Sequence, residues 1–214
     1  PTATSSRPGI CGKHMRRIID RTIRVLRRRL GAWRAVLQAR RVTEQRLRAG
    51  PLRRMLVVCY GNIYRSPFVG EYLRAHLPIE VEVRTRGFHP VAERPSPARH
   101  VEMCRRLGID LSAHRSTILS QDDLEWADSV VLMDRHNWVA LIEAGVAPEK
   151  LLWLGALGSG SVEIPDPYAM DAADAERVLR RMQRACDELI HRVRQAHKPA
   201  AASALSEAAS ARTP

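Results

Sequence analysis

The chain has 214 residues, of which 45% are hydrophobic, enough for one packed domain with an extension and too many for wholesale disorder. The net charge of +12 is uneven, because residues 1–54 hold 16 of the 35 Lys and Arg but two of the 23 Asp and Glu. The four cysteines lack the spacing of a zinc site or a disulfide framework, so we expect a reducing, cytoplasmic location and no metal. The sequence has no apolar run of membrane-spanning length and no visible secretory signal.

The basic segment 1–54 is expected to form a helical extension. From about Met15, apolar residues recur at spacings of four and three with arginines on the other faces: Ile19, Ile23, Leu26, Leu30, Trp33 and Leu37. The coiled-coil-like spacing favours a helix–helix contact, and an anionic membrane surface is the other partner that suits such a stripe. We therefore expect residues 15–48 to mediate self-association or to lie on an anionic membrane, with nucleic-acid binding disfavoured.

Residues 55–197 alternate between short apolar runs and helical patterns. Strands are predicted at 55–59, 81–85, 129–133 and 151–154, and helices at 66–77, 96–107, 134–144 and 172–195. This alternation predicts an α/β fold, a doubly wound four-stranded parallel sheet with helices on both faces. Ser66 is expected to cap the first of these helices, and the Ala/Ser-rich tail 198–214 is expected to be disordered.

The first strand-to-helix turn carries the candidate site. Cys59 ends a strand, five residues intervene, and Arg65 and Ser66 begin a helix. A loop of this size can surround a tetrahedral oxyanion with backbone N–H groups, with the helix N-terminus beneath it. Gly61 and Asn62 tolerate the left-handed backbone that such a loop needs, and Arg65 can grip two phosphate oxygens. The same positive field favours the thiolate of Cys59, to which Ser66 can donate a hydrogen bond.

A thiolate that attacks phosphorus forms a phosphocysteine and expels an oxygen, which needs a proton from a general acid. Asp166 is the best candidate, because it follows the fourth strand and therefore lies at the same end of the sheet. The prolines on either side of it stiffen the loop. The same carboxylate can later activate the water that hydrolyses the intermediate.

These segments resemble the low-molecular-weight protein tyrosine phosphatases. Cys59 to Pro67 is similar to the family's phosphate-binding loop, and Asp166-Pro167-Tyr168 to its general-acid loop. The segments 108–115 and 131–136 also resemble family segments, and the likeness runs from about Leu56 to Val193. It implies a flavodoxin-like sheet, a cofactor-free cysteine phosphatase and a tyrosine-phosphorylated protein as substrate.

The resemblance also implies individual roles. Cys59 is the expected nucleophile, Arg65 the phosphate clamp and Asp166 the general acid. Asn62 and Ser66 are expected to support the loop and the thiolate, His114 to brace the loop, and Tyr168 to line the substrate pocket. The phosphate-binding residues implied are Tyr60, Gly61, Asn62, Ile63, Tyr64, Arg65 and Ser66.

The chain departs from the family at Tyr64, where many members carry a second cysteine, and at residues 85–89. Three alternatives compete with phosphotyrosine hydrolysis. A protein-arginine phosphatase has a similar loop with Thr at the position of Ile63, and the branched apolar Ile63 favours a flat ring. Arsenate reduction needs further cysteines near the first, and Cys104 and Cys186 are distant in sequence. A non-catalytic phosphate-binding scaffold does not require the intact set of Cys59, Arg65 and Asp166.

Overall fold

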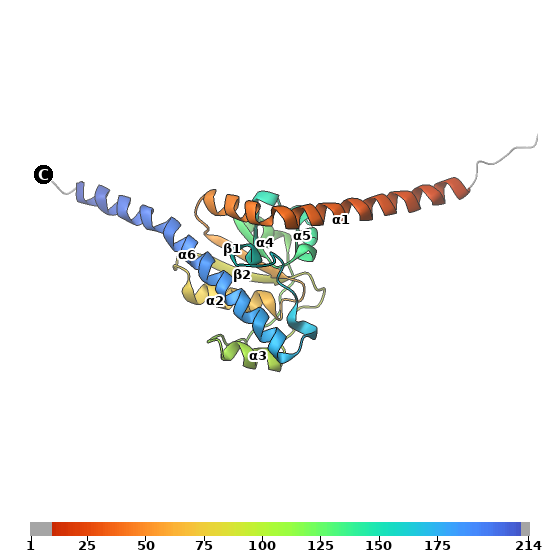
Figure 1. Cartoon of the computed structure of the whole chain (residues 1–214). Helices are drawn as coiled ribbons and strands as arrows, with labels where there is room; N and C mark the ends of the chain where they lie inside the picture. The colour runs from red at the N-terminus through yellow and green to blue at the C-terminus, as the bar shows by residue number, and fades with distance from the viewer. Residues whose placement is uncertain (1–9, 211–214) are drawn as a thin grey trace, which may run out of the picture.

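The protein is described by a computed structural model that covers residues 10–210, with side chains described for residues 19–197. Figure 1 shows a central sheet with helices on both faces and two long helices, the first and the last, that extend beyond the body in opposite directions. The elements, in chain order, are α1 (Ile10–Arg48), β1 (Arg54–Cys59), α2 (Arg65–His76), β2 (Glu82–Gly87), α3 (Ala98–Arg105), α4 (Gln121–Trp126), β3 (Ser129–Leu132), α5 (Arg135–Glu143), η1 (Pro148–Lys150), β4 (Leu151–Trp153), η2 (Leu154–Leu157), η3 (Pro167–Ala169) and α6 (Ala172–Ser210).

The sheet has the order β2-β1-β3-β4, and every pair of neighbouring strands is parallel. β1 therefore lies inside the sheet, with Cys59 opposite Gly87 at the end of β2. The predicted doubly wound four-stranded parallel sheet is confirmed. In such a sheet, the crevice beyond the carboxyl ends of the strands is the usual ligand site, and Cys59 ends β1 at that edge.

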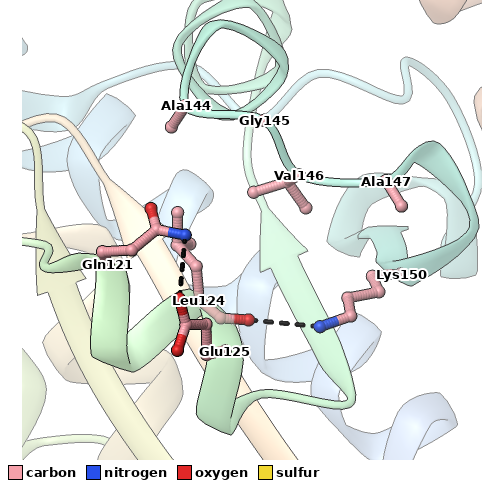
Figure 2. A pocket seen from close by; sticks show the side chains of 8 residues that line it. All are labelled: Gln121, Leu124, Glu125, Ala144, Gly145, Val146, Ala147 and Lys150. Carbon is pink, nitrogen blue, oxygen red and sulfur yellow. Dashed lines mark hydrogen bonds between the residues drawn. The ribbon is translucent and has the colours of Figure 1, made fainter.

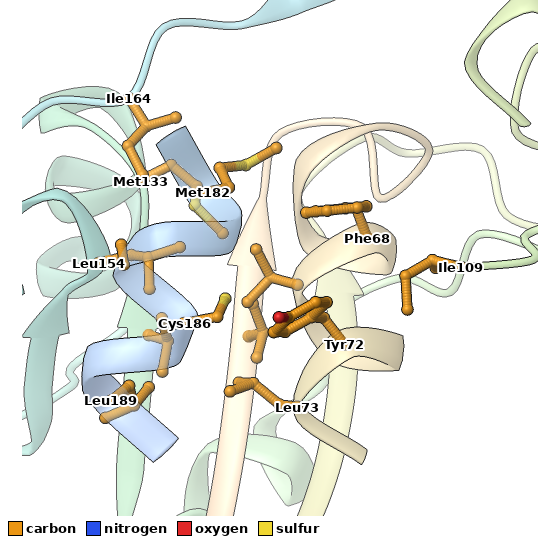
Figure 3. Packing of buried hydrophobic residues seen from close by; sticks show 14 of the residues in the cluster. Phe68, Tyr72, Leu73, Ile109, Met133, Leu154, Ile164, Met182, Cys186 and Leu189 are labelled. Carbon is orange, nitrogen blue, oxygen red and sulfur yellow. The ribbon is translucent and has the colours of Figure 1, made fainter. Parts of the chain in front are cut away.

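Strand β1 is apolar throughout because both of its faces are covered. Met55, Val57 and Cys59 point into a core formed with α2, α3 and α6, whereas Leu56 and Val58 point into a second core formed with α1, α4 and α5. Figure 3 shows the first core, in which Met182, Cys186 and Leu189 of α6 face Phe68, Tyr72 and Leu73 of α2 across β1. Burial of each aliphatic side chain stabilises the fold by about 1.5–3 kcal/mol. Because β1 is packed on both faces in this way, the loop that follows Cys59 starts from a firmly held strand.

Some helix boundaries differ from the predicted ones. α2 begins at Arg65 rather than after Ser66, and Tyr64 occupies the cap position without a side-chain cap. α4 was not predicted from the sequence, and its N-terminus is closed by a capping box between Ser120 and Asp123. α6 continues to Ser210, beyond the predicted end near Gln195. The side chains from residue 198 onward and residues 1–9 and 211–214 lie outside the described residues, so the predicted disorder of 198–214 stays a prediction.

The N-terminal extension is helical, as predicted, and its second half is packed on the body. Ala32, Ala39 and Thr43 of α1 are buried, and α1 contacts β4 and α5. Arg40 donates hydrogen bonds to the carbonyl oxygens of Ala156, Gly158 and Gly160 at 2.7, 2.9 and 2.8 Å. The predicted apolar stripe lies on another face, and all six of its residues are exposed. None of the helices between residues 10 and 210 combines the length and apolarity needed to cross a membrane.

Candidate active site

The sulfur of Cys59 lies at the base of the loop that joins β1 to α2. It accepts a hydrogen bond from the backbone N–H of Asn62 at 3.3 Å, and the Ser66 hydroxyl lies 3.1 Å away. Cys59 is 2% exposed, but its neighbours are hydrogen-bond donors, unlike the surroundings of an ordinary core cysteine. Ser66 is therefore engaged at the sulfur rather than as the expected helix cap, and the donors around the sulfur suit a thiolate.

Asn62 holds the loop in a conformation that few residues adopt. Its φ of 50° lies in the left-handed region, where asparagine is favoured over most residues other than glycine. Its fully buried side chain donates to the Ser66 hydroxyl at 2.9 Å and accepts from the backbone N–H of Thr117 at 2.8 Å. The sequence analysis assigned Asn62 to loop support, and the structure places it at the centre of the hydrogen-bond network.

The loop carbonyl groups are held from outside by donors of other segments. The backbone N–H groups of Phe88 and His89 both donate at 2.9 Å to Tyr60 O, and Arg94 donates at 2.5 Å to Gly61 O. His114 contacts Asn62 O at 2.7 Å, and His100 contacts Tyr64 O at 3.0 Å.

These contacts explain why the loop amides point inward. The C=O and N–H of a trans peptide unit point in opposite directions, so a carbonyl held on the outside turns the next N–H toward the centre of the loop. The amide of Asn62, whose peptide unit is held through Gly61 O by Arg94, does point at the sulfur. By the same argument, the held carbonyl groups of residues 60, 62 and 64 would turn the N–H groups of residues 61, 63 and 65 toward the centre, and a ring of this kind would suit an oxyanion.

The absence of a side chain at Gly87 leaves room for the backbone of the loop at Tyr60 and Asn62. A Cβ atom at this position would lie 2.9 Å from the Tyr60 carbonyl oxygen and 2.9 Å from the Cβ of Asn62. Both distances are shorter than side-chain packing allows, so a larger residue at the end of β2 would displace the loop backbone.

Arg65 connects the loop to two carboxylates. Its Nη1 donates to Asp134 Oδ2 at 2.5 Å and to the carbonyl oxygen of Ile164 at 3.0 Å, and its Nη2 donates to Asp166 Oδ2 at 2.7 Å. Burial of the guanidinium opposes its charge, but the neighbouring Cys59, Asp166 and Asp134 outweigh burial and raise the pKa of Arg65. Arg65 is 2% exposed, and within the described part of the chain its Nε has no hydrogen-bond partner. A buried charged donor without a partner is costly, and an anionic ligand would satisfy it.

The two carboxylates differ in their surroundings. The side chain of Asp134 is 13% exposed and also caps α5 by accepting from the N–H of Asn137. The side chain of Asp166 is 42% exposed and accepts from the N–H of Tyr168 at 3.2 Å. Asp166 is thus the more accessible carboxylate beside the loop, where we expected the general acid. Asp134 is a partner of Arg65 that the sequence analysis did not single out, although its place directly after the third strand was a usable signal.

Two histidines hold the loop in their uncharged form. Burial lowers the pKa of His100 to about 4, although its hydrogen bond to the Tyr64 carbonyl acts in the other direction. Burial likewise lowers the pKa of His114. Since a carbonyl oxygen can only accept, the Nε2 atom of each ring carries the proton. The family resemblance of residues 108–115 led us to expect that His114 braces the loop, whereas His100 and Arg94 were missed, because they lie outside the segments in which a resemblance was seen.

Aromatic rings surround the loop. The Tyr64 ring lies 4.3 Å from His100 and 5.8 Å from Tyr168, edge to face with the latter, and Tyr60 meets His89 at 5.7 Å. Tyr60 and Tyr168 are exposed, at 57% and 69%. Tyr168 thus lies beside the loop, as expected of a residue that lines the substrate pocket.

The other described cysteines, and a hollow at the opposite edge of the sheet, differ from this site. Burial raises the pKa of the Cys104 thiol to about 12 and also raises that of Cys186, so both favour the unreactive thiol. A hollow of about 230 Å³ lies between α4 and the segment after α5. Figure 2 shows the residues that line it, among them Leu124, Val146 and Lys150. It lies near the amino ends of β3 and β4, the opposite edge of the sheet from Cys59.

Comparisons with known proteins agree with the geometry of the site. A protein-family model described as low molecular weight phosphotyrosine protein phosphatase matches residues 54–199. EpsP of Ralstonia nicotianae, a probable low molecular weight protein-tyrosine-phosphatase, is 30% identical over 152 residues, which cover 67% of this chain and 97% of that protein. Etp of Escherichia coli K12, a low molecular weight protein-tyrosine-phosphatase, is 32% identical over 142 residues, which cover 65% of this chain and 93% of that protein.

Two further relatives extend the comparison. A protein-arginine-phosphatase of Geobacillus stearothermophilus is 32% identical over 118 residues, 54% of this chain and 78% of that protein. The tyrosine phosphatase Wzb from Escherichia coli K30, solved in complex with sulphate, has a TM-score of 0.62 and 24% identity, covers 66% of this chain and 99% of that one, and supports the fold. The chain belongs to the low molecular weight protein-tyrosine-phosphatase family, whose members are metal-independent cysteine phosphatases.

Proposed function

We propose that this phosphatase hydrolyses phosphotyrosine residues of proteins through a phosphocysteine intermediate. One observation carries the proposal. The sulfur of Cys59 accepts from the Asn62 amide inside a loop whose arginine, Arg65, is hydrogen bonded to the exposed carboxylate of Asp166. Nucleophile, anion clamp and proton donor are thereby joined at one edge of the sheet.

In the first step, the Cys59 thiolate attacks phosphorus, and the bond between phosphorus and the tyrosine oxygen breaks. The amides of the loop and the guanidinium of Arg65 stabilise the charge on the oxygens of the transferring group. Asp166 gives its proton to the departing phenolate, which leaves as tyrosine. The product is a phosphocysteine and a deprotonated Asp166.

In the second step, Asp166 takes a proton from water, and the resulting nucleophile attacks the phosphocysteine. The sulfur–phosphorus bond breaks, inorganic phosphate leaves, and Cys59 returns to the thiolate while Asp166 is again protonated. The Ser66 hydroxyl, 3.1 Å from the sulfur, stabilises the thiolate as a leaving group.

Binding of the phosphate group also explains how the Asp166 carboxyl is released from Arg65 to act on the substrate. With no ligand, the Asp166 carboxylate is held by Arg65 Nη2 at 2.7 Å. A phosphate dianion in the loop competes for the same guanidinium and engages the unpartnered Nε. We infer that this exchange frees the Asp166 carboxyl from the guanidinium so that it can face the leaving oxygen, whereas Asp134 keeps Arg65 in place.

The surroundings of the loop favour an aryl substrate. Exposed Tyr60 and Tyr168 can pack against a flat ring, and Ile63 adds a branched apolar side chain within the loop. Arginine phosphatase activity is the second candidate, supported by the arginine phosphatase of Geobacillus stearothermophilus that is 32% identical. Turnover of matched phosphotyrosine and phosphoarginine peptides decides between them, and we expect a higher kcat/KM for phosphotyrosine.

The mechanism is tested with an aryl phosphate and no added metal. We expect Cys59→Ser to abolish turnover, and Asp166→Ala to slow turnover by roughly 10²–10⁴-fold and to let the phosphocysteine accumulate after an acid quench. Cys104→Ser is the matched control, since this buried thiol takes no part in the proposed chemistry. Equal activity of Cys59→Ser and the unaltered enzyme would refute the proposal.

We further propose a cytoplasmic location and a docking function for residues 15–48. The free thiols of Cys59, Cys104 and Cys186 suit a reducing compartment. Two partners are considered for the basic helix: a second copy of the chain and an anionic membrane surface. Positive charges beside the apolar stripe favour binding to an anionic membrane and oppose binding to a second copy.

A further inference from the structure

Helix α1 carries an apolar stripe that the rest of the described chain does not cover. The stripe consists of Ile19, Ile23, Leu26, Leu30, Trp33 and Leu37. Its members are all exposed, and Leu30 and Leu37 reach 56% and 65%. Burial of α1 against the body falls instead on Ala32, Ala39 and Thr43, which lie on a different face of the helix. An apolar row of about five turns that faces away from its own body suits a partner outside the chain.

Unpaired arginines border the stripe. Arg27, Arg34 and Arg41 recur every seven residues along one side, and Arg29 lies on the other. Within residues 19–197, none of these four side chains has a carboxylate partner. Other arginines of α1 do contact the body, as Arg28 does with Glu143 at 2.7 Å. The four border arginines are thus free to meet a negatively charged partner.

These charges argue against a second copy of the helix as the partner. In a coiled coil, the residues that border the apolar seam of one helix lie next to those of the other. Two copies of α1 would bring Arg27, Arg29, Arg34 and Arg41 next to one another, in either orientation. Asp20 is the one acid in the sequence between residues 19 and 43, so the repulsion has little compensation.

We propose that α1 docks the enzyme on an anionic membrane surface. The helix lies in the plane of the interface with the stripe among the upper parts of the acyl chains, and the border arginines contact lipid phosphates and other anionic head groups. Trp33 lies at the depth where amphipathic rings are favoured. One surface supplies both the apolar and the anionic contacts that the helix presents. The inference rests on α1 alone and is independent of the proposed catalytic steps.

The test is sedimentation of the full chain with vesicles of phosphatidylglycerol and phosphatidylcholine, compared with phosphatidylcholine alone. We expect binding to the anionic vesicles that weakens as salt rises, because salt screens the arginines. The variant Leu26→Gln/Leu30→Gln should bind at least roughly tenfold more weakly, because it removes two apolar contacts. The variant Arg27→Gln/Arg34→Gln/Arg41→Gln should lose roughly a hundredfold or more in affinity.

Matched controls separate the helix from general surface properties. Ile79→Gln/Val91→Gln removes two exposed apolar residues outside α1, and Arg105→Gln/Arg106→Gln/Arg180→Gln removes the same number of exposed charges. Both controls should bind vesicles like the unaltered protein. All variants should hydrolyse an aryl phosphate in solution at the unaltered rate, which distinguishes a failure of docking from a failure of the enzyme.

Three results would overturn the proposal. The first is equal binding to anionic and neutral vesicles, or to neither. The second is a lipid-free dimer in sedimentation velocity that Leu26→Gln/Leu30→Gln dissociates, which would assign the stripe to a second copy. The third is vesicle binding that duplex DNA abolishes by competition and that the two leucine substitutions do not change, which would reduce the effect to a general affinity for polyanions.

Discussion

The catalytic loop and the first half of α1 differ in how far their side chains and backbone groups are engaged by the rest of the chain. In the loop, carbonyl groups of Tyr60, Gly61, Asn62 and Tyr64 have donors from other segments, and the Asn62 side chain is fully buried. In residues 19–30 of α1, every side chain is exposed, and Ile19, Ile23, Leu26 and Leu30 form an apolar row. The loop is thus positioned by contacts with other segments of the chain, whereas the apolar row of α1 is exposed and is not covered by the described body. The contrast indicates where changes should affect catalysis and where they should affect docking alone.

The largest effect is expected at Arg65, where the loop meets both carboxylates. Arg65→Lys keeps the charge but loses the fork that contacts Asp134, Ile164 O and Asp166 together. We expect kcat/KM for an aryl phosphate to fall by roughly a thousandfold. Arg29→Lys, on the exposed face of α1, is the matched control and should leave kcat/KM unchanged. A loss below about fivefold for Arg65→Lys would contradict the assigned role.

A variant of His100 tests whether this buried histidine makes the free energy of unfolding depend on pH in the acid range. Because its pKa is about 4 in the folded protein and 6.5 in an unstructured chain, the unfolded state binds a proton first as pH falls. The neutral ring thus stabilises the fold fully above pH 6.5, and this contribution is lost between pH 6.5 and 4. At about 1.4 kcal/mol per pH unit, the loss reaches about 3 kcal/mol.

The measurement is the free energy of unfolding by urea at pH 7 and at pH 4. His100→Gln keeps a donor for the Tyr64 carbonyl but does not titrate, so its stability should fall less with pH than that of the unaltered protein. Parallel pH dependence in the two proteins would show that His100 is not the group that responds to acid.

Gly87 tests how closely the loop must be positioned. In Gly87→Ala the new Cβ would lie 2.9 Å from the Tyr60 carbonyl oxygen, so the loop has to move. We expect kcat/KM to fall by roughly 10- to 100-fold, because small displacements of reacting groups are costly. Gly158→Ala has no atom within 4 Å of the new Cβ and serves as the control. Similar kcat/KM in both variants would show that the loop tolerates the displacement.

The smallest effect on the isolated enzyme is expected in the stripe. Leu30→Gln should change the free energy of unfolding by less than about 0.5 kcal/mol, since Leu30 is 56% exposed. Ala39→Gln, at a fully buried position of the same helix, should destabilise the protein by more than about 1 kcal/mol because it overpacks the core. Urea denaturation of both variants measures the difference, and equal destabilisation would place the stripe in the folding core.

The sequence predicted the sheet well, because the strands depend on local patterns, and the same kind of pattern indicated where the candidate site begins. Apolar runs marked all four strands, and the spacing from Cys59 to Arg65 marked the loop. The loop contacts of His100 and Arg94 join positions 36 and 33 residues apart, which no local pattern reveals, and neither residue lies in the segment whose family resemblance led us to expect His114. The capping of α2 was predicted wrongly because Ser66 has a stronger competing partner in the sulfur of Cys59.

The contact between Thr43 and β4 has a consequence for shorter versions of the chain. β4 is an outer strand of the sheet, and the N–H of Trp153 donates at 3.0 Å to the hydroxyl of buried Thr43. A protein trimmed to begin at Met55 would retain the entire catalytic loop, yet its outer strand would present an unsatisfied amide next to uncovered apolar surface. Such a strand is a template for pairing between molecules, so the trimmed enzyme would fail by aggregating rather than by losing its chemistry.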